Sequence, residues 1–249
     1  MRLLILGGTT EATRLAARLA DRADISATLS YAGRTEVPAS QPIPVRVGGF
    51  GGAEGLARYL AENKVDLLID ATHPFAARIS DNAAIAAKAT ETSILVLTRK
   101  PWARQTGDQW IEVANNAEAV AALGDAPRRV FLTIGRLGVG DFRAAPQHHY
   151  LIRTIDAPDR ADMPPDHRLI LARGTFALDD EIALMRAEKI DVLVTKNSGG
   201  DATYAKIAAA RARAIPVVMV TPPRRPDVPE IYSTDDCMRV IEGHLSASG

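Results

Sequence analysis

The 249-residue sequence contains a single cysteine, Cys237, which excludes an internal disulfide and a cysteine-rich metal site. Aromatic residues make up 5% of the chain, and 30 basic side chains balance 30 acidic ones. This balance gives no bulk charge that would attract nucleic acid or an anionic membrane. No apolar run is long enough to cross a bilayer, and the His and carboxylate spacing shows no metal motif. We therefore expect a cytoplasmic protein that binds no metal, and we interpret Cys237 as a small buried apolar residue.

Apolar runs and helical stretches alternate along the chain, which favours an α/β fold with parallel sheets. The N-terminus enters the first strand at once, so a signal peptide is not expected. The first series of predicted strands covers residues 3–6, 25–29, 45–47, 65–70 and 93–97, with helices at 53–62 and 74–89. The second series has strands at 130–133, 150–154, 169–172, 192–195 and 217–220, with helices at 178–188, 202–212 and 234–245.

Residues 99–107 break this alternation and resemble a connection between two series. We therefore expect two Rossmann-like lobes whose parallel sheets face a central cleft. Residues 1–98 form the first domain of this interpretation and residues 99–249 the second, with the final helix free to pack across the boundary. In such sheets ligands lie beyond the carboxyl ends of the strands, so the loops at those ends are where we look for chemistry.

The first predicted strand runs directly into a glycine turn, Gly7-Gly8-Thr9-Thr10, and then into a helix. A nucleotide pyrophosphate needs this order, because glycines let the backbone turn tightly and the free N–H groups of the new helix face the anion. Against the pattern G-x-G-x-x-G, Thr9 replaces the second glycine. The pyrophosphate then lies further out or accepts a hydrogen bond from the Thr9 hydroxyl. The alternative is a plain turn after the first strand of an α/β domain.

The end of the second strand indicates the choice of coenzyme. An acid there binds the ribose 2′-hydroxyl of NAD, whereas a nearby arginine accommodates the 2′-phosphate of NADP. This strand ends in Ser30-Tyr31, with Arg34 close behind and no Asp or Glu. A hydroxyl and a guanidinium suit a phosphate, so the sequence favours NADP over NAD. The alternative is an ordinary polar loop with a solvated arginine.

Two more loops of the first lobe suit a ligand. Gly48-Gly49-Phe50-Gly51-Gly52 follows the third strand and offers N–H groups with room for close approach; its alternative is a flexible turn. The fourth strand leads into Asp70-Ala71-Thr72-His73-Pro74. His73 at this strand–helix junction can donate to an anion or transfer a proton. The alternative is a histidine that only braces the junction.

In the second lobe, three strand ends carry a cation or lead directly to one. These cations are Arg136, Arg173 and Lys196, and Lys196 is followed by Asn197-Ser198-Gly199. Such a pattern predicts a positively charged surface that binds an acidic substrate, although the net charge of the chain is zero. The alternative for each cation is a solvated loop side chain.

Four stretches together resemble the precorrin-6A reductase family of cobalamin biosynthesis: residues 7–12, 48–50, 70–76 and 195–199. The resemblance covers almost the whole chain, and the His-Pro-Phe and Thr-Lys-Asn-Ser-Gly stretches are specific. Two positions depart from the family pattern: Gly51 stands where a larger apolar residue is usual, and Asn197 where relatives also have an acid. Both affect loop detail more than the assignment.

The resemblance implies an enzyme that uses NADPH to reduce one carbon–carbon double bond of a polycarboxylated tetrapyrrole, giving precorrin-6B. The residues expected to bind NADPH are Gly7, Gly8, Thr9, Thr10, Glu11, Ser30, Tyr31, Arg34, Gly48, Gly49, Phe50 and Thr72. Those expected to bind the substrate are Arg136, Arg173, Lys196, Asn197, Ser198 and Gly199. The proton for the second carbon comes from water or from His73.

Two other functions stay open at this point. One is a non-catalytic module that senses NADP, although a sensor has no need for cationic strand ends in its second lobe. The other is an NADPH-dependent reductase of a different small substrate. In every case we expect a monomer or weak dimer with no nucleic-acid or membrane partner.

Overall fold

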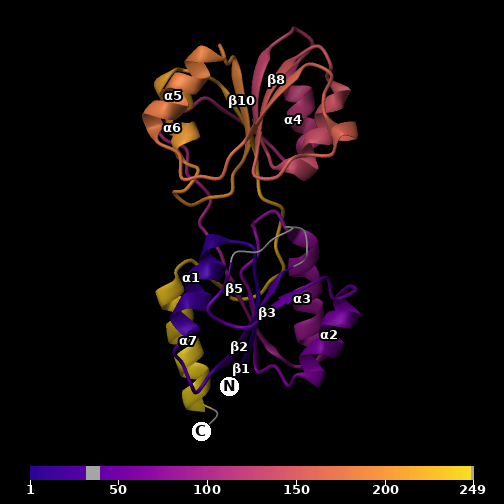
Figure 1. Cartoon of the computed structure of the whole chain (residues 1–249), viewed down its shortest axis with the longest axis vertical. Helices are drawn as coiled ribbons and strands as arrows, with labels where there is room; N and C mark the ends of the chain where they lie inside the picture. Colours follow the sequence, from indigo (N-terminus) through magenta and orange to yellow (C-terminus); the bar gives the residue numbers. More distant parts are fainter. Residues whose placement is uncertain (32–39, 248–249) are drawn as a thin grey trace. The chain divides into compact units, whose positions relative to one another are not determined.

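The computed structural model describes residues 1–31 and 40–247 and divides into two compact units. Unit 1 comprises Met1–Lys100 together with Pro223–Gly249, and unit 2 comprises Pro101–Pro222. The chain therefore passes from one unit to the other twice (Figure 1). This division differs from the expected one at the C-terminus, because residues 223–249 belong to the first unit.

Unit 1 contains a six-stranded parallel sheet with the strand order β12-β5-β4-β1-β2-β3. The apolar runs of its central strands are buried, as is usual for parallel sheets, whereas Val45 and Val47 of an edge strand are exposed. The strands are β1 (Arg2–Leu6), β2 (Ser26–Tyr31), β3 (Val45–Val47), β4 (Leu67–Asp70), β5 (Ser93–Leu97) and β12 (Glu230–Ile231).

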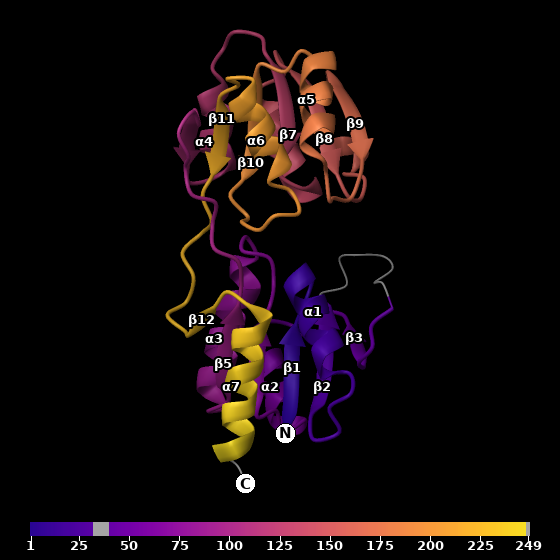
Figure 2. The same ribbon diagram turned by 90° about the vertical axis from the view of Figure 1, so that its left-hand side faces the viewer.

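Helices cover both faces of this sheet (Figures 1 and 2). Helices α1 (Thr10–Leu19) and α7 (Thr234–Ala247) pack on one face, where Leu15 and Ile241 share a core with Leu3 of β1. Helices α2 (Ala53–Glu62) and α3 (Ala77–Ala89) cover the other face. Because successive residues of a strand point to opposite faces, β1 contributes Leu3 and Ile5 to one core and Leu4 and Leu6 to the other.

The C-terminal segment returns to unit 1 because its apolar side chains complete the core under α1. Cys237, Met238 and Ile241 of α7 are buried there. Burial raises the pKa of the Cys237 thiol to about 12, as its interpretation as an apolar core residue requires. The short strand β12 also adds to the sheet edge: Val96 N–H donates to Pro229 O at 2.9 Å and Thr98 N–H to Ile231 O at 2.9 Å.

Unit 2 contains a second six-stranded parallel sheet, with the order β6-β11-β10-β7-β8-β9. The strands are β6 (Trp110–Val113), β7 (Arg129–Thr133), β8 (His149–Thr154), β9 (His167–Leu171), β10 (Val192–Lys196) and β11 (Val217–Val220). Helices α5 (Leu178–Ala187) and α6 (Ala205–Ala212) cover one face, and Figure 1 shows α4 (Asn116–Leu123) on the other. Two 3₁₀ helices, η1 (Arg136–Ala144) and η2 (Arg160–Asp162), complete the unit.

The α/β class with two parallel sheets is confirmed, and several predicted elements match closely. The sequence pattern did not predict β6, α4 or β12. It also began the third helix too early: residues 74–76 form a turn in which Ala76 N–H donates to His73 O at 2.7 Å, so α3 starts at Ala77. In each unit the strands are parallel, so their carboxyl ends lie along one edge of the sheet.

Candidate functional site

The glycine turn lies at the carboxyl end of β1, where Gly7 and Gly8 separate the strand from α1. Gly7 N–H donates to Ser30 O at 2.9 Å, which ties the turn to the end of β2. Gly8 has φ = +118°, a conformation that favours glycine, and the space where a Cβ would point is empty. The first-turn N–H groups of α1 have no partner within the helix, so this edge suits an anion.

Thr9 is the N-cap of α1, and its hydroxyl is fully engaged within the protein. Thr9 Oγ1 donates to Ala71 O at 2.7 Å and accepts from Ala12 N–H at 3.2 Å. Its single hydrogen is therefore not available to a pyrophosphate in this geometry. Of the two arrangements that the sequence left open, a ligand held further out by backbone N–H groups fits the structure better.

Glu11, in the first turn of α1, forms an ion pair with Arg99, a residue that follows β5. Arg99 Nε lies 3.5 Å from Glu11 Oε2, and both side chains are largely buried, with 18% and 15% exposed. A carboxylate beside a bound pyrophosphate would repel it, so the guanidinium has to offset that charge. Sequence reasoning missed Arg99 because it begins the segment interpreted as a connection.

At the end of β2, Ser30 is buried and Tyr31 is half-buried. Burial raises the pKa of the Tyr31 hydroxyl, and a hydrogen bond with Thr13 opposes that shift. The predicted phosphate ligand Arg34 lies outside the described residues. The cation that the structure does place beside Ser30 is Arg46 of β3, whose Nη1 lies 3.4 Å from Ser30 Oγ.

Arg46 organises the glycine loop after β3. Its Nη1 donates to Gly48 O and its Nη2 to Gly49 O at 3.0 Å. The guanidinium also lies 3.8 Å from the centre of the Phe50 ring, within the range of a cation–π contact. Gly48, Gly51 and Gly52 have positive φ, so the loop turns sharply here. The sequence signal that could have revealed this role is an arginine at the end of a strand just before paired glycines.

The loop after β4 is held by the buried carboxylate of Asp70. Asp70 Oδ1 accepts from Thr72 N–H at 3.0 Å and from the Thr72 hydroxyl at 2.6 Å. Asp70 Oδ2 accepts from the Ser80 hydroxyl of α3 at 2.5 Å. The carboxylate thus fixes Thr72, a predicted coenzyme residue, and the start of the following helix.

His73 follows Thr72, and its Nδ1 accepts from Phe75 N–H at 3.2 Å. In this geometry the ring proton lies on Nε2, because Nδ1 acts as an acceptor. A neutral ring of this kind offers one N–H donor. To act as an acid it must first be protonated at Nδ1, which would break the contact with Phe75. The geometry therefore favours a fixed donor over a proton-transferring group.

The three predicted substrate cations follow β7, β9 and β10 of unit 2. Lys196 ends β10 and Arg136 begins η1 after β7, and these two strands are neighbours in the sheet. Arg173 is exposed after β9, which is separated from β7 by β8. Burial lowers the pKa of Lys196, while the negative charge of Asp141 opposes that shift. A half-buried ammonium of this kind gains from an anionic partner.

Asn197, the next predicted substrate residue, is buried and its amide binds the backbone of Trp102. Asn197 Oδ1 accepts from Trp102 N–H at 2.7 Å, and Asn197 Nδ2 donates to Trp102 O at 3.0 Å. Ser198 N–H donates to Lys196 O at 2.9 Å, and Gly199 has φ = +66°. The loop after β10 is therefore tightly turned, with Ser198 partly exposed.

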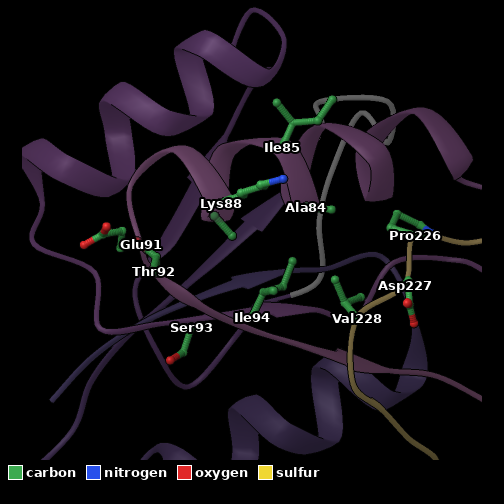
Figure 3. A pocket seen from close by; sticks show the side chains of 11 residues that line it. Ala84, Ile85, Lys88, Glu91, Thr92, Ser93, Ile94, Pro226, Asp227 and Val228 are labelled. Atoms are coloured by element: carbon green, nitrogen blue, oxygen red, sulfur yellow. The ribbon is translucent and has the colours of Figure 1, made fainter.

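A hollow of about 550 Å³ lies elsewhere in unit 1 (Figure 3). It is lined by the second half of α3, the start of β5 and residues 226–228. Because Ser93 and Ile94 begin β5, this hollow lies toward the amino end of that strand. It is thus away from the edge that carries the predicted coenzyme residues.

Within the described residues, no three His, Cys, Asp or Glu side chains are grouped so that they could hold a metal ion. Residues 1–31 and 40–247 also include no helix with the length and apolar character needed to cross a membrane.

Comparison with known proteins gives one consistent result. The family model described as "Precorrin-6x reductase CbiJ/CobK" matches residues 2–242. A precorrin-6A reductase of Sinorhizobium sp is 52% identical over 245 residues, covering 98% of this chain and 94% of the relative. One from Rhodobacter capsulatus is 50% identical over 242 residues, covering 97% and 93%. A solved structure titled "CobK precorrin-6A reductase" superposes with a TM-score of 0.91 at 47% identity, covering 98% of this chain and 97% of that one.

The engaged hydroxyl of Thr9 leads to a prediction about stability. Thr9→Val removes the N-cap and the bond to Ala71, so the free energy of unfolding should fall by about 1 kcal/mol, measured by denaturant titration. Thr9→Ser should restore most of this loss. Thr10→Val, the same chemical change at an exposed neighbouring position, is the control. Equal stability of the Thr9→Val and Thr10→Val proteins would show that the cap contributes nothing.

Proposed function

The chain belongs to the precorrin-6x reductase family, and from this premise we propose that it reduces precorrin-6A to precorrin-6B with NADPH in cobalamin biosynthesis. One carbon–carbon double bond of the macrocycle takes up one hydride and one proton in this reaction. The observation that carries the proposal is the match to precorrin-6A reductases along nearly the whole chain. The rival functions, an NADP sensor and a reductase of another compound, have no such support.

In this proposal unit 1 binds the coenzyme at the carboxyl edge of its sheet. The open space beside Gly8 and the N–H groups at the start of α1 fit a pyrophosphate. The glycine loop ordered by Arg46 and the Thr72 loop ordered by Asp70 flank this position in the sheet order. A bound nicotinamide dinucleotide supplies the hydride. The protein supplies position, through loops that are already held in place.

Unit 2 binds the tetrapyrrole in this proposal, through Arg136, Arg173, Lys196, Ser198 and the backbone at Gly199. The substrate is rich in carboxylates, and charge-assisted hydrogen bonds from these cations would orient the macrocycle. Their role is binding and not proton transfer. A cationic edge in a chain without net charge is what an acidic small-molecule substrate requires.

The second carbon of the reduced bond receives its proton from water in this proposal. His73 then acts as a hydrogen-bond donor through Nε2, because its Nδ1 is engaged by Phe75 N–H. Asp70 holds Thr72, and His73 follows Thr72 directly in the chain. His73 thus helps to orient the coenzyme at the edge of unit 1.

The function is tested by recording absorbance while the protein is incubated with NADPH and precorrin-6A. We expect loss of NADPH to be coupled to a change in the macrocycle spectrum, one equivalent for each tetrapyrrole reduced. Binding of NADPH without either change would instead support the sensor. NADPH oxidation with a small carbonyl compound, but not with precorrin-6A, would support the second rival.

The coenzyme preference leads to a prediction for Arg34. If Arg34 binds the 2′-phosphate, Arg34→Ala should weaken NADPH binding by about ten- to a hundredfold, the value of one charge-assisted hydrogen bond. NADH binding should scarcely change, as measured by calorimetry with both coenzymes. Arg14→Ala, on the exposed face of α1, is the control. Equal losses for NADPH and NADH would place Arg34 away from the phosphate.

Lys196 leads to a prediction about the substrate. Lys196→Ala should raise the KM for precorrin-6A by about tenfold, because one ion-paired hydrogen bond is lost, while the Kd for NADPH stays constant. High salt should raise the wild-type KM in the same direction. Arg186→Ala on the exposed side of α5 provides a matched loss of charge in the same unit. Loss of NADPH binding with unchanged KM would reverse the assignment of the two units.

A further inference from the structure

Trp102 lies near the start of unit 2, just after the chain leaves unit 1 at Lys100. Three hydrogen bonds join it to the loop that follows β10, almost a hundred positions later in the sequence. Two are the reciprocal bonds between its backbone and the Asn197 amide, at 2.7 and 3.0 Å. In the third, the indole Nε1–H donates to Gly200 O at 2.7 Å. The backbone and the ring of one residue therefore hold two points of the same loop.

Lys206 of α6 connects the far end of this loop to the same indole through a hydrogen bond and a cation–π contact. Lys206 Nζ donates to Thr203 O at 2.9 Å and lies 5.0 Å from the centre of the Trp102 ring. The Lys206 side chain is buried, with the residue 5% exposed. A buried ammonium over an indole gains from the ring as a cation–π partner. Residues 197–203 are thus held near both ends to a single tryptophan.

This loop begins directly after Lys196 and contains Ser198 and Gly199, the groups proposed to bind a substrate carboxylate. Asn197 lies between Lys196 and Ser198, yet it is 7% exposed and its amide is bound to Trp102. A ligand cannot replace those two bonds without leaving the Trp102 N–H and carbonyl unpaired. That loss would cost free energy because both groups are partly buried.

We propose that Trp102 and Asn197 are positioning residues, which hold the loop after β10 in the shape that receives a substrate carboxylate. Neither touches the substrate; both act through Lys196, Ser198 and the backbone at Gly199. This inference rests on the proposed function, since it concerns the binding of that substrate. It also replaces the role of ligand that the sequence predicted for Asn197.

The packing of unit 2 does not by itself require these bonds. Trp110 belongs to the core cluster against which Trp102 packs, and it is 6% exposed. Its buried Nε1 has no hydrogen-bond partner within the described residues. The core therefore accommodates a tryptophan without such a bond. Trp102 and Trp110 are the two tryptophans of the chain, so one serves as a matched control for the other.

The kinetic test compares Trp102→Phe, Asn197→Leu and Trp110→Phe. Trp102→Phe keeps an aromatic ring under Lys206 but loses the bond to Gly200, so the KM for precorrin-6A should rise by about three- to tenfold. Asn197→Leu removes two bonds and should raise this KM at least as much. In both proteins the Kd for NADPH should stay within twofold of the wild-type value. Trp110→Phe should leave the KM unchanged even where it lowers the thermal stability.

A second test needs no substrate, because it follows the emission of Trp102 in the Trp110→Phe protein. Burial, followed by the charge of Arg153, lowers the pKa of Lys206 to about 7, although the charge of Glu181 opposes the shift. Tyr204 also contacts Trp102, with the centroids of the two rings 5.8 Å apart, and its hydroxyl is a second titratable group beside the indole. As pH rises from 6 to 8, Lys206 loses its charge over the indole. The emission should therefore change with a midpoint near 7, and Lys206→Met should abolish that change.

The two tests separate failure of the inference from failure of the proposed function. If the wild-type protein does not reduce precorrin-6A, the function fails, while the emission titration still reports on the contact between Lys206 and Trp102. If the wild type is active but Trp102→Phe and Asn197→Leu match Trp110→Phe in KM, the positioning role is wrong. The positioning role is also wrong if these two substitutions raise the Kd for NADPH as much as the KM for precorrin-6A, because the damage would then not be confined to substrate binding.

Discussion

Parallel pairing of the strands in both sheets decides where ligands can bind. A parallel pair cannot be closed by a hairpin, so each crossover helix returns the chain to the amino edge before the next strand begins. Every strand then ends at the same edge. Gly8, Gly48 and Thr72 are far apart in the sequence, yet they follow the strands β1, β3 and β4 of one sheet. The same constraint places Arg136 and Lys196 after neighbouring strands of the other unit.

At these edges many polar side chains bind the protein's own backbone. Thr9 binds Ala71 O, Arg46 binds the carbonyls of the glycine loop, and Asn197 binds Trp102. Such bonds order the loops before any ligand arrives, which reduces the conformational entropy lost on binding. Thr9, Arg46 and Asn197 therefore hold the loops in shape through contacts within the protein.

The sequence predicted the elements whose signal is local. Residues 94–97 and 217–220 are continuous apolar runs, and the structure contains the predicted strands at 93–97 and 217–220. It missed β12, because a two-residue strand has no pattern of its own and forms only by pairing with β5. The loop positions were visible because glycine and threonine mark turns. The partners of the side chains in those loops were not visible, because Thr9–Ala71 and Trp102–Asn197 join distant parts of the chain.

The return of residues 223–249 to unit 1 has a consequence for how the chain folds during synthesis. Unit 2 is one continuous segment, so all of its strands are synthesised before α7. Unit 1 cannot close its core until Cys237, Met238 and Ile241 are available to pack beneath α1. The first unit to be started is therefore the last to be finished, and its incomplete sheet edge beside β5 stays open while unit 2 is synthesised.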